Sequence, residues 1–203
     1  MRQKNGIVMT SSCIECAAQS SYCCHKLFIR GLDNFGFRHP AFGQLEKREQ
    51  MDLILWRHAE AIDLDLVGDD MMRYLTPRGE KQAKRVAAWL DRQMPDGAKV
   101  FASPAIRAEQ TASALERKFK INAALSPLAT PDQLLELVQW PYGKGCTLVV
   151  GHQPTLGQVV SRLVGLQESE CALKKGALWW LRYRERDGVG QTVVVTVQSP
   201  ELV

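Results

Sequence analysis

From residue 51 onward, short apolar runs alternate with longer segments whose apolar residues recur every three or four positions. The short runs predict five strands, at Leu53–Trp56, Lys99–Ala102, Thr147–Val150, Leu178–Tyr183 and Thr192–Val197. The longer segments predict four helices, from Pro77 to before Pro95, from Ser103-Pro104 to about Phe119, and at Pro131–Val138 and Pro154–Val164. Strands that alternate with helices in this way predict a layered α/β fold.

The first two of these helices begin with a hydroxyl residue followed by proline. Thr76 precedes Pro77, and Ser103 precedes Pro104. A threonine or serine at the N-cap accepts a hydrogen bond from the first turn, and proline at the next position already has a helical φ. The sequence therefore predicts Thr76 and Ser103 as N-caps.

The first fifty residues differ from the rest, because they show no sustained period of 2 or 3.6. Met51 stands just before the first predicted strand, so we expect residues 1–50 to be a poorly ordered or mis-called extension. Residues 51–203 then form the functional domain. A folded extension would instead be a regulatory or anchoring arm.

Most of the cysteines lie in this extension, in a pattern that invites a zinc site. The residues concerned are Cys13, Cys16, Cys23, Cys24 and His25. Only six residues separate the two cysteine pairs, and adjacent cysteines seldom bind one ion together with good geometry. We therefore expect no metal and no other cofactor.

Composition excludes several classes of protein. The chain has 203 residues, is 45% hydrophobic and carries a formal net charge of +4, which suits one globular domain. No run of Lys and Arg stands out, so we expect no nucleic-acid partner. No apolar stretch approaches the roughly 20 residues of a membrane span. No apolar run follows Arg2 and Lys4 as in a secretory signal, so we expect a cytoplasmic protein with reduced thiols and no membrane association.

Chemically active residues follow three of the predicted strands. Arg57 and His58 follow the first, Ser103 and then Arg107 follow the second, and His152 follows the third. Ligands of open α/β sheets bind beyond the carboxyl ends of the strands, so two histidines and two arginines should converge there. Arginine matches the oxygens of a phosphate, and neutral imidazole is a competent nucleophile. The pattern indicates phosphoryl transfer.

Other interpretations of the same residues remain open. A histidine at a strand end is often structural, and Arg57 alone would suit a solvated surface. A metal site at His58 and His152 is a further alternative, although no carboxylate or cysteine stands at metal-ligand spacing from either residue.

Four segments, taken in order, resemble motifs of the histidine phosphatase superfamily, which has the phosphoglycerate mutase-like fold. They are Leu53–Glu60 ("RHG/RHA"), Leu75–Gly79 ("LTxxG"), Ser103–Ala112 ("SPxxRAxQTA") and Val149–Pro154 ("VGHxP"). Their order and spacing are similar to those of the short SixA-type phosphohistidine phosphatases. The resemblance implies a three-layer α/β/α sandwich with a mostly parallel central sheet.

The resemblance also implies roles for individual residues. His58 would be the phosphorylated nucleophile, and Arg57, Arg107 and His152 would hold the phosphate. Arg73, just before the "LTxxG" segment, would line the pocket or be a surface charge.

The resemblance leaves the proton donor open. Many members supply a proton from a carboxylate, and the matching stretch here offers only Asp132, which also suits the first turn of a helix. Glu60 and Glu109 are expected to orient an arginine or to face solvent.

The resemblance therefore predicts a phosphatase with a phosphohistidine intermediate that acts on phosphohistidine of a partner protein. No large insertion separates His58 from Arg107 or Arg107 from His152, so the site should be shallow enough for a protein side chain. The alternatives are a phosphatase of small phosphomonoesters and a catalytically idle phosphate-binding module. The sequence leaves the oligomeric state open.

Overall fold

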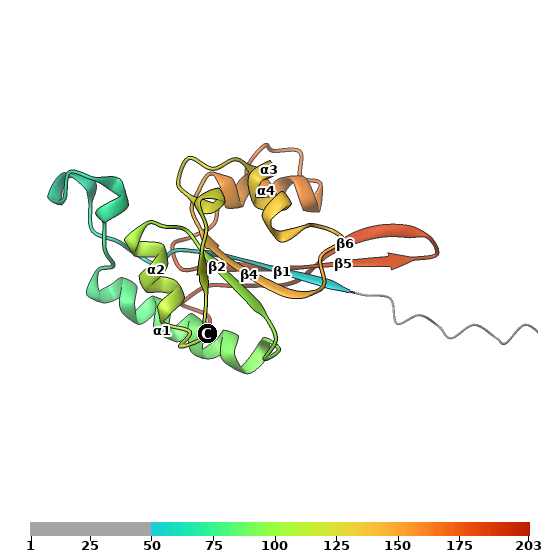
Figure 1. Cartoon of the computed structure of the whole chain (residues 1–203), viewed down its shortest axis with the longest axis horizontal. Helices are drawn as coiled ribbons and strands as arrows, with labels where there is room; N and C mark the ends of the chain where they lie inside the picture. Colours follow the sequence, from blue (N-terminus) through green and yellow to red (C-terminus); the bar gives the residue numbers. More distant parts are fainter. Residues whose placement is uncertain (1–49) are drawn as a thin grey trace, which may run out of the picture. The chain divides into compact units, whose positions relative to one another are not determined.

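The computed structural model describes residues 50–203 (Figure 1). The predictions for the extension and for the cysteines and His25 within it lie outside these residues. Strand β1 (Met51–Arg57) is the first element among the described residues.

A six-stranded sheet forms the centre of this part of the chain, in the order β3-β2-β4-β1-β5-β6. The other strands are β2 (Lys99–Ala102), β3 (Lys120–Ile121), β4 (Gly145–Gly151), β5 (Leu178–Arg186) and β6 (Val189–Gln198). The first four strands in the sheet run parallel, and β5 and β6 run antiparallel to their neighbours. All five predicted strands are confirmed, while β3 is too short to show a period and was not predicted.

Four helices connect the strands: α1 (Pro77–Gln93), α2 (Ile106–Ser113), α3 (Pro131–Val138) and α4 (Thr155–Val164). Short 3-10 turns lie at Leu64–Leu66 (η1), Asp70–Met72 (η2) and Ala123–Leu125 (η3). Thr76 caps α1 as predicted, because its side chain accepts a bond from the Gly79 N–H. None of the helices within residues 50–203 combines the length and apolarity that a membrane crossing needs.

The predicted helix from Ser103 to Phe119 is wrong at both ends. Ser103 directly follows β2 and its backbone N–H donates to the Val150 carbonyl of β4 at 3.0 Å, and the helix starts only at Ile106. The helix ends at Ser113 because Glu116 soon adopts a left-handed conformation with φ 54°, which helical geometry excludes.

The helices cover both faces of the sheet, α1 and α2 on one side and α3 and α4 on the other (Figure 1). Side chains that alternate along β1 serve the two faces. Ile54 and Trp56 pack in the core that contains α1 and α2, whereas Leu53 and Leu55 pack in the core that contains α3 and α4. The three-layer α/β/α sandwich with a mostly parallel sheet is thus confirmed.

The insertion of β4 between β1 and β2 determines where the site forms. The chain passes from β1 through α1 to β2, and β4 later occupies the position between them. Arg57 pairs with Gly151 at the end of the β1–β4 ladder, so the next residues of the two strands are His58 and His152. The register brings the two histidines side by side at the carboxyl edge of the sheet.

Gly79 lets the start of α1 pack against the backbone that follows β1. A Cβ at this position would lie 1.9 Å from the Glu60 carbonyl oxygen, a backbone atom that cannot rotate away. We expect Gly79→Ala to lower the free energy of unfolding by about 2–4 kcal/mol, measured by urea denaturation. Gly97→Ala is the matched control, because a Cβ there meets nothing within 4 Å. Equal stability of the two variants would contradict the close packing at Gly79.

Candidate active site

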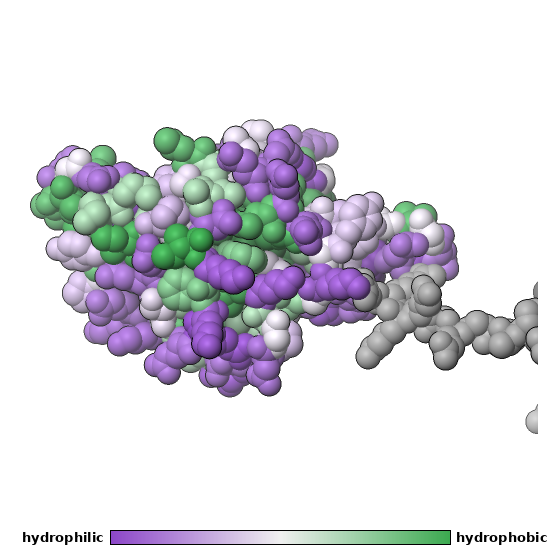
Figure 2. Space-filling model, in the orientation of Figure 1, coloured by the Kyte–Doolittle hydropathy of each residue, from purple (hydrophilic) through white to green (hydrophobic). Residues whose placement is uncertain are grey.

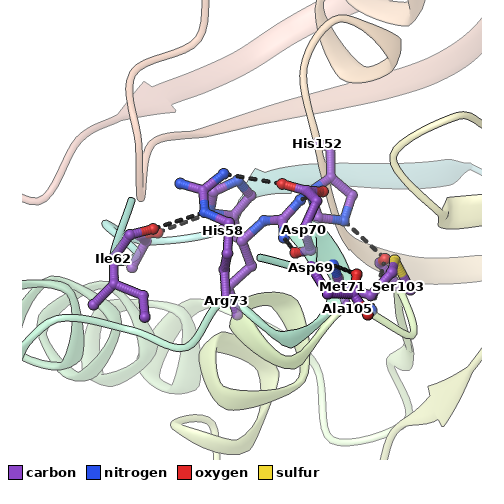
Figure 3. Close-up of polar contacts among 11 residues, drawn as sticks. His58, Ile62, Asp69, Asp70, Met71, Arg73, Ser103, Ala105 and His152 are labelled. Carbon is purple, nitrogen blue, oxygen red and sulfur yellow. Dashed lines mark hydrogen bonds and ion pairs between the residues drawn. The ribbon is translucent and has the colours of Figure 1, made fainter. Parts of the chain in front are cut away.

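His58 and His152 form the centre of the candidate site (Figure 3). Both side chains are buried, with 6% and 3% of their surface exposed, and their ring centroids are 5.0 Å apart. The backbone N–H of His58 donates to the Gly151 carbonyl at 3.1 Å and so joins the end of β1 to the end of β4. The structure therefore brings together the two histidines that the sequence placed at separate strand ends.

The hydrogen bond of His58 determines which ring nitrogen is available for chemistry. Nδ1 lies 2.8 Å from the Ala59 carbonyl oxygen. Because a carbonyl oxygen can only accept, Nδ1 carries the proton in the neutral ring and Nε2 keeps a free lone pair. His58 is thus held in the tautomer that a nucleophile at Nε2 requires.

Burial and nearby positive charges keep this ring neutral. The pKa of His58 is lowered to about 3, chiefly by burial; the bond to Ala59 raises it, and the charges of Arg107, Arg57 and Arg73 lower it. At neutral pH the imidazole therefore carries no proton on Nε2.

His152 is held from the neighbouring strand end of β2. Its Nε2 lies 2.8 Å from Ser103 Oγ, and the same Oγ accepts a bond from the Ala105 backbone N–H at 3.2 Å. Burial, followed by the charges of His58 and Arg107, lowers the pKa of His152 to about 3. Ser103 thus fixes the ring of His152 instead of capping a helix, a role that appears only once β2 and β4 are adjacent.

Three arginines surround the histidines. Arg57 ends β1 and donates to the Leu173 carbonyl, and burial lowers its pKa. Arg107 lies in the first turn of α2 and is only 3% exposed. Arg73 donates from Nε to the Ile62 carbonyl at 2.7 Å (Figure 3). All three lie close enough to His58 for their charges to lower its pKa. Every predicted site residue therefore lies in one cluster.

Asp70 is a member of this cluster that the sequence did not single out. Its Oδ2 accepts from Arg107 at 2.8 Å, and its Oδ1 accepts from Arg73 at 3.0 Å. Partial burial tends to raise the pKa of Asp70, but the bonds from Arg107 and Arg73 outweigh it and hold the pKa below its ordinary value. In the sequence, the one indication of this role is that Asp70 lies three residues before Arg73.

The other carboxylates that the sequence suggested lie elsewhere. Asp132 pairs with Arg162 of α4 and its side chain is 81% exposed. Glu60 accepts from Thr76 Oγ1 at 3.0 Å and lies 3.6 Å from Arg78, so it orients an arginine outside the histidine cluster. Among residues 50–203, no group of three or more His, Cys, Asp or Glu side chains could hold a metal ion.

The depressed histidine pKa values predict an acid-sensitive fold. In the unfolded chain each ring has a pKa of about 6.5, whereas His58 and His152 in the folded protein have pKa values of about 3. Between these values the unfolded state binds protons that the folded state does not, so stability falls as pH falls. We expect the protonation of each histidine in the unfolded chain to lower the free energy of unfolding by about 1–2 kcal/mol between pH 7 and pH 5.

Urea denaturation at several pH values measures this dependence. The variant His152→Gln lacks one of the two titrating rings, while its carboxylates titrate as in the wild type. Its stability should therefore depend less on pH, and an unchanged dependence would show that His152 is not buried in the neutral form.

Comparison with known proteins gives relatives that include phosphohistidine phosphatases. The profile of the histidine phosphatase superfamily (branch 1) matches residues 53–136. Phosphohistidine phosphatase SixA of Escherichia coli is 31% identical over 121 residues, which are 56% of this chain and 74% of that protein. A SixA homolog of Haemophilus influenzae is 27% identical over 130 residues, 57% of this chain and 78% of that protein.

A solved structure agrees with these relatives. The protein histidine phosphatase SixA complexed with tungstate superposes with a TM-score of 0.59 at 25% identity, over 74% of this chain and 97% of that one.

Proposed function

The chain belongs to the histidine phosphatase superfamily, and from this premise we propose that it removes phosphate from phosphohistidine of a partner protein, by way of a phosphorylated His58. We further propose residues 51–203 as the phosphatase domain. The observation that carries the proposal is the state of His58: a neutral ring with its proton on Nδ1 and a free Nε2 lone pair, beside three arginines.

The reaction would proceed in two displacements at phosphorus. In the first, a P–N bond forms at His58 Nε2 while the bond from phosphorus to the substrate nitrogen breaks. The substrate ring, protonated on its other nitrogen, keeps the electron pair of that bond and leaves as neutral imidazole. In the second, a water oxygen bonds to phosphorus, the P–Nε2 bond breaks and its electron pair returns to His58. The proton of the water leaves with phosphate or solvent.

In the proposed mechanism, Arg57, Arg107 and His152 hold the phosphoryl group, and Arg73 assists them. Each of the first three has a buried polar atom without a hydrogen-bond partner among residues 50–203: Arg57 Nε, Arg107 Nε and His152 Nδ1. Buried polar groups without partners cost about 1–3 kcal/mol each, so a ligand that accepts hydrogen bonds is favoured here. A phosphoryl group offers three such acceptors.

Within the part of the chain that the structure describes, no carboxylic acid able to donate a proton lies in the cluster, which favours a nitrogen leaving group. Asp132 pairs with Arg162 away from the histidines. Asp70 is ionised and bound to two arginines, so it has no proton to give at neutral pH. A phosphohistidine departs as an imidazole and needs less help from an acid than an alkoxide does.

A protein partner is supported by the surface of the segment between β1 and α1. Its side chains Leu64, Leu66, Met72 and Tyr74 are exposed by 44%, 76%, 51% and 52%. Figure 2 shows hydrophobic surface at the end of the molecule where this segment projects. Apolar side chains beside a phosphate site offer a protein substrate contacts that a small phosphate ester could not use.

A substrate comparison tests this proposal. The full-length protein should release phosphate faster, in terms of kcat/KM, from a phosphohistidine-bearing protein than from sugar phosphates or an aryl phosphate. The reverse order would replace the proposal with a phosphatase of small phosphomonoesters. If phosphate were released from none of these substrates, a catalytically idle phosphate-binding module would be the remaining interpretation.

A further inference from the structure

The carboxylate of Asp70 makes the contacts that a bound oxyanion would make. One oxygen accepts from Arg107 Nη2 and the other from Arg73 Nη1, at 2.8 Å and 3.0 Å. The two arginines belong to different segments, α2 and the turn before α1, so the carboxylate bridges them. Figure 3 shows the Asp70 carboxylate lying between the guanidinium of Arg73 and the ring of His152.

We propose that Asp70 is an internal competitor for the phosphate site, which the substrate phosphoryl group must displace from Arg107 and Arg73. The proposal rests on the proposed function, in which these arginines hold the phosphoryl group. Asp70 is then a specificity-determining residue. An anion that contacts only the two arginines obtains no more binding energy than the Asp70 carboxylate already obtains from them.

The local structure allows the carboxylate to leave without unfolding the turn. The Asp70 side chain is 40% exposed, so rotation of the side chain leads directly into solvent. Two other bonds hold the turn in place: the Asp70 carbonyl accepts from Arg107 Nη1, and the Asp69 carboxylate accepts from the Met71 N–H at 2.9 Å. When a phosphoryl group displaces the Asp70 side chain, it replaces the two ion pairs of the carboxylate with the arginines, and η2 stays in place.

Competition of this kind favours phosphoproteins over free phosphate. A substrate that also contacts the exposed side chains between β1 and α1 gains binding energy elsewhere, and part of that energy offsets the displacement of Asp70. Inorganic phosphate has no such contacts, so it binds weakly and leaves readily after hydrolysis. The carboxylate therefore both selects large substrates and reduces inhibition by the product.

Titration calorimetry with inorganic phosphate tests the inference on the full chain, without any need for turnover. Asp70→Asn keeps the shape of the side chain and removes the charge that binds the arginines. We expect this variant to bind phosphate about tenfold more tightly than the wild type, equivalent to about 1.4 kcal/mol.

Asp63→Asn is the matched control, since it removes the same charge from the same segment at an exposed residue with no capping bond. Phosphate affinity of the control should equal that of the wild type.

The outcomes separate this inference from the proposed function. Equal affinities of wild type and Asp70→Asn, weaker binding in the variant, or no phosphate binding in either protein would overturn the inference. So would a crystal structure with bound phosphate in which Asp70 still contacts both arginines. Failure to hydrolyse phosphohistidine would instead count against the proposed function, and the calorimetric difference would stand independently of it.

Discussion

Replacing His58 with alanine is expected to abolish turnover, with a fall in kcat of at least about 10⁴-fold. The substitution removes the Nε2 lone pair on which the proposed covalent intermediate depends, and the Nε2 of His152, the other histidine among residues 50–203, lies against Ser103 Oγ. Two measurements check the result: the rate of phosphate release from a phosphohistidine-bearing protein, and the amount of acid-labile phosphate that remains on the enzyme.

Gly97→Ala again provides the control, because it lies before β2 at the opposite end of the strand from Ser103 and should keep wild-type turnover. Circular dichroism establishes that His58→Ala is folded. Wild-type turnover in folded His58→Ala would show that the nucleophile lies elsewhere. Loss of turnover with the acid-labile label retained would place the phosphate on another residue, and His152 would then be the next to test.

The second large effect is expected at Arg107. Arg107→Lys retains the charge but replaces a planar fork of donors with a single ammonium group, so the two-nitrogen grip seen on Asp70 is lost. We expect kcat/KM to fall by about 10²–10³-fold, since in the proposed mechanism the arginine stabilises charge that develops on the transferred phosphoryl group.

Arg117→Lys is the matched control for this prediction. Arg117 also uses two nitrogens on one carboxylate oxygen, that of Asp91, but it takes no part in the histidine cluster. Its substitution should leave kcat/KM within about twofold of the wild type, as expected for an ion pair outside the site. Equal effects at Arg107 and Arg117 would remove Arg107 from the proposed phosphate site.

Much of the site could be predicted from the sequence because strand ends are local signals. The short apolar runs before His58 and His152 mark buried strands, and parallel strands place their carboxyl ends at one edge. The cap at Thr76 was also visible, because a threonine before proline satisfies the first turn of a helix through neighbours in the sequence.

The parts that the sequence did not reveal depend on contacts between distant segments. Ser103 looks like an N-cap, yet it bonds to His152 because β2 and β4 become neighbours in the sheet. Asp70 looks like one acidic residue among several, and only the approach of Arg107 on α2 makes it a bridge between two arginines. Local propensity contains no information about either contact.

The position of β4 in the sheet has a consequence for the order of events during folding. β1 and β2 are separated until β4 fills the gap between them, so a chain that has formed only its first two strands has His58 but neither the His152 ring nor its anchor on Ser103. This non-local pairing is slow to form relative to the helices. We therefore expect no phosphate transfer from any partly folded form in which β4 has not yet paired with β1 and β2.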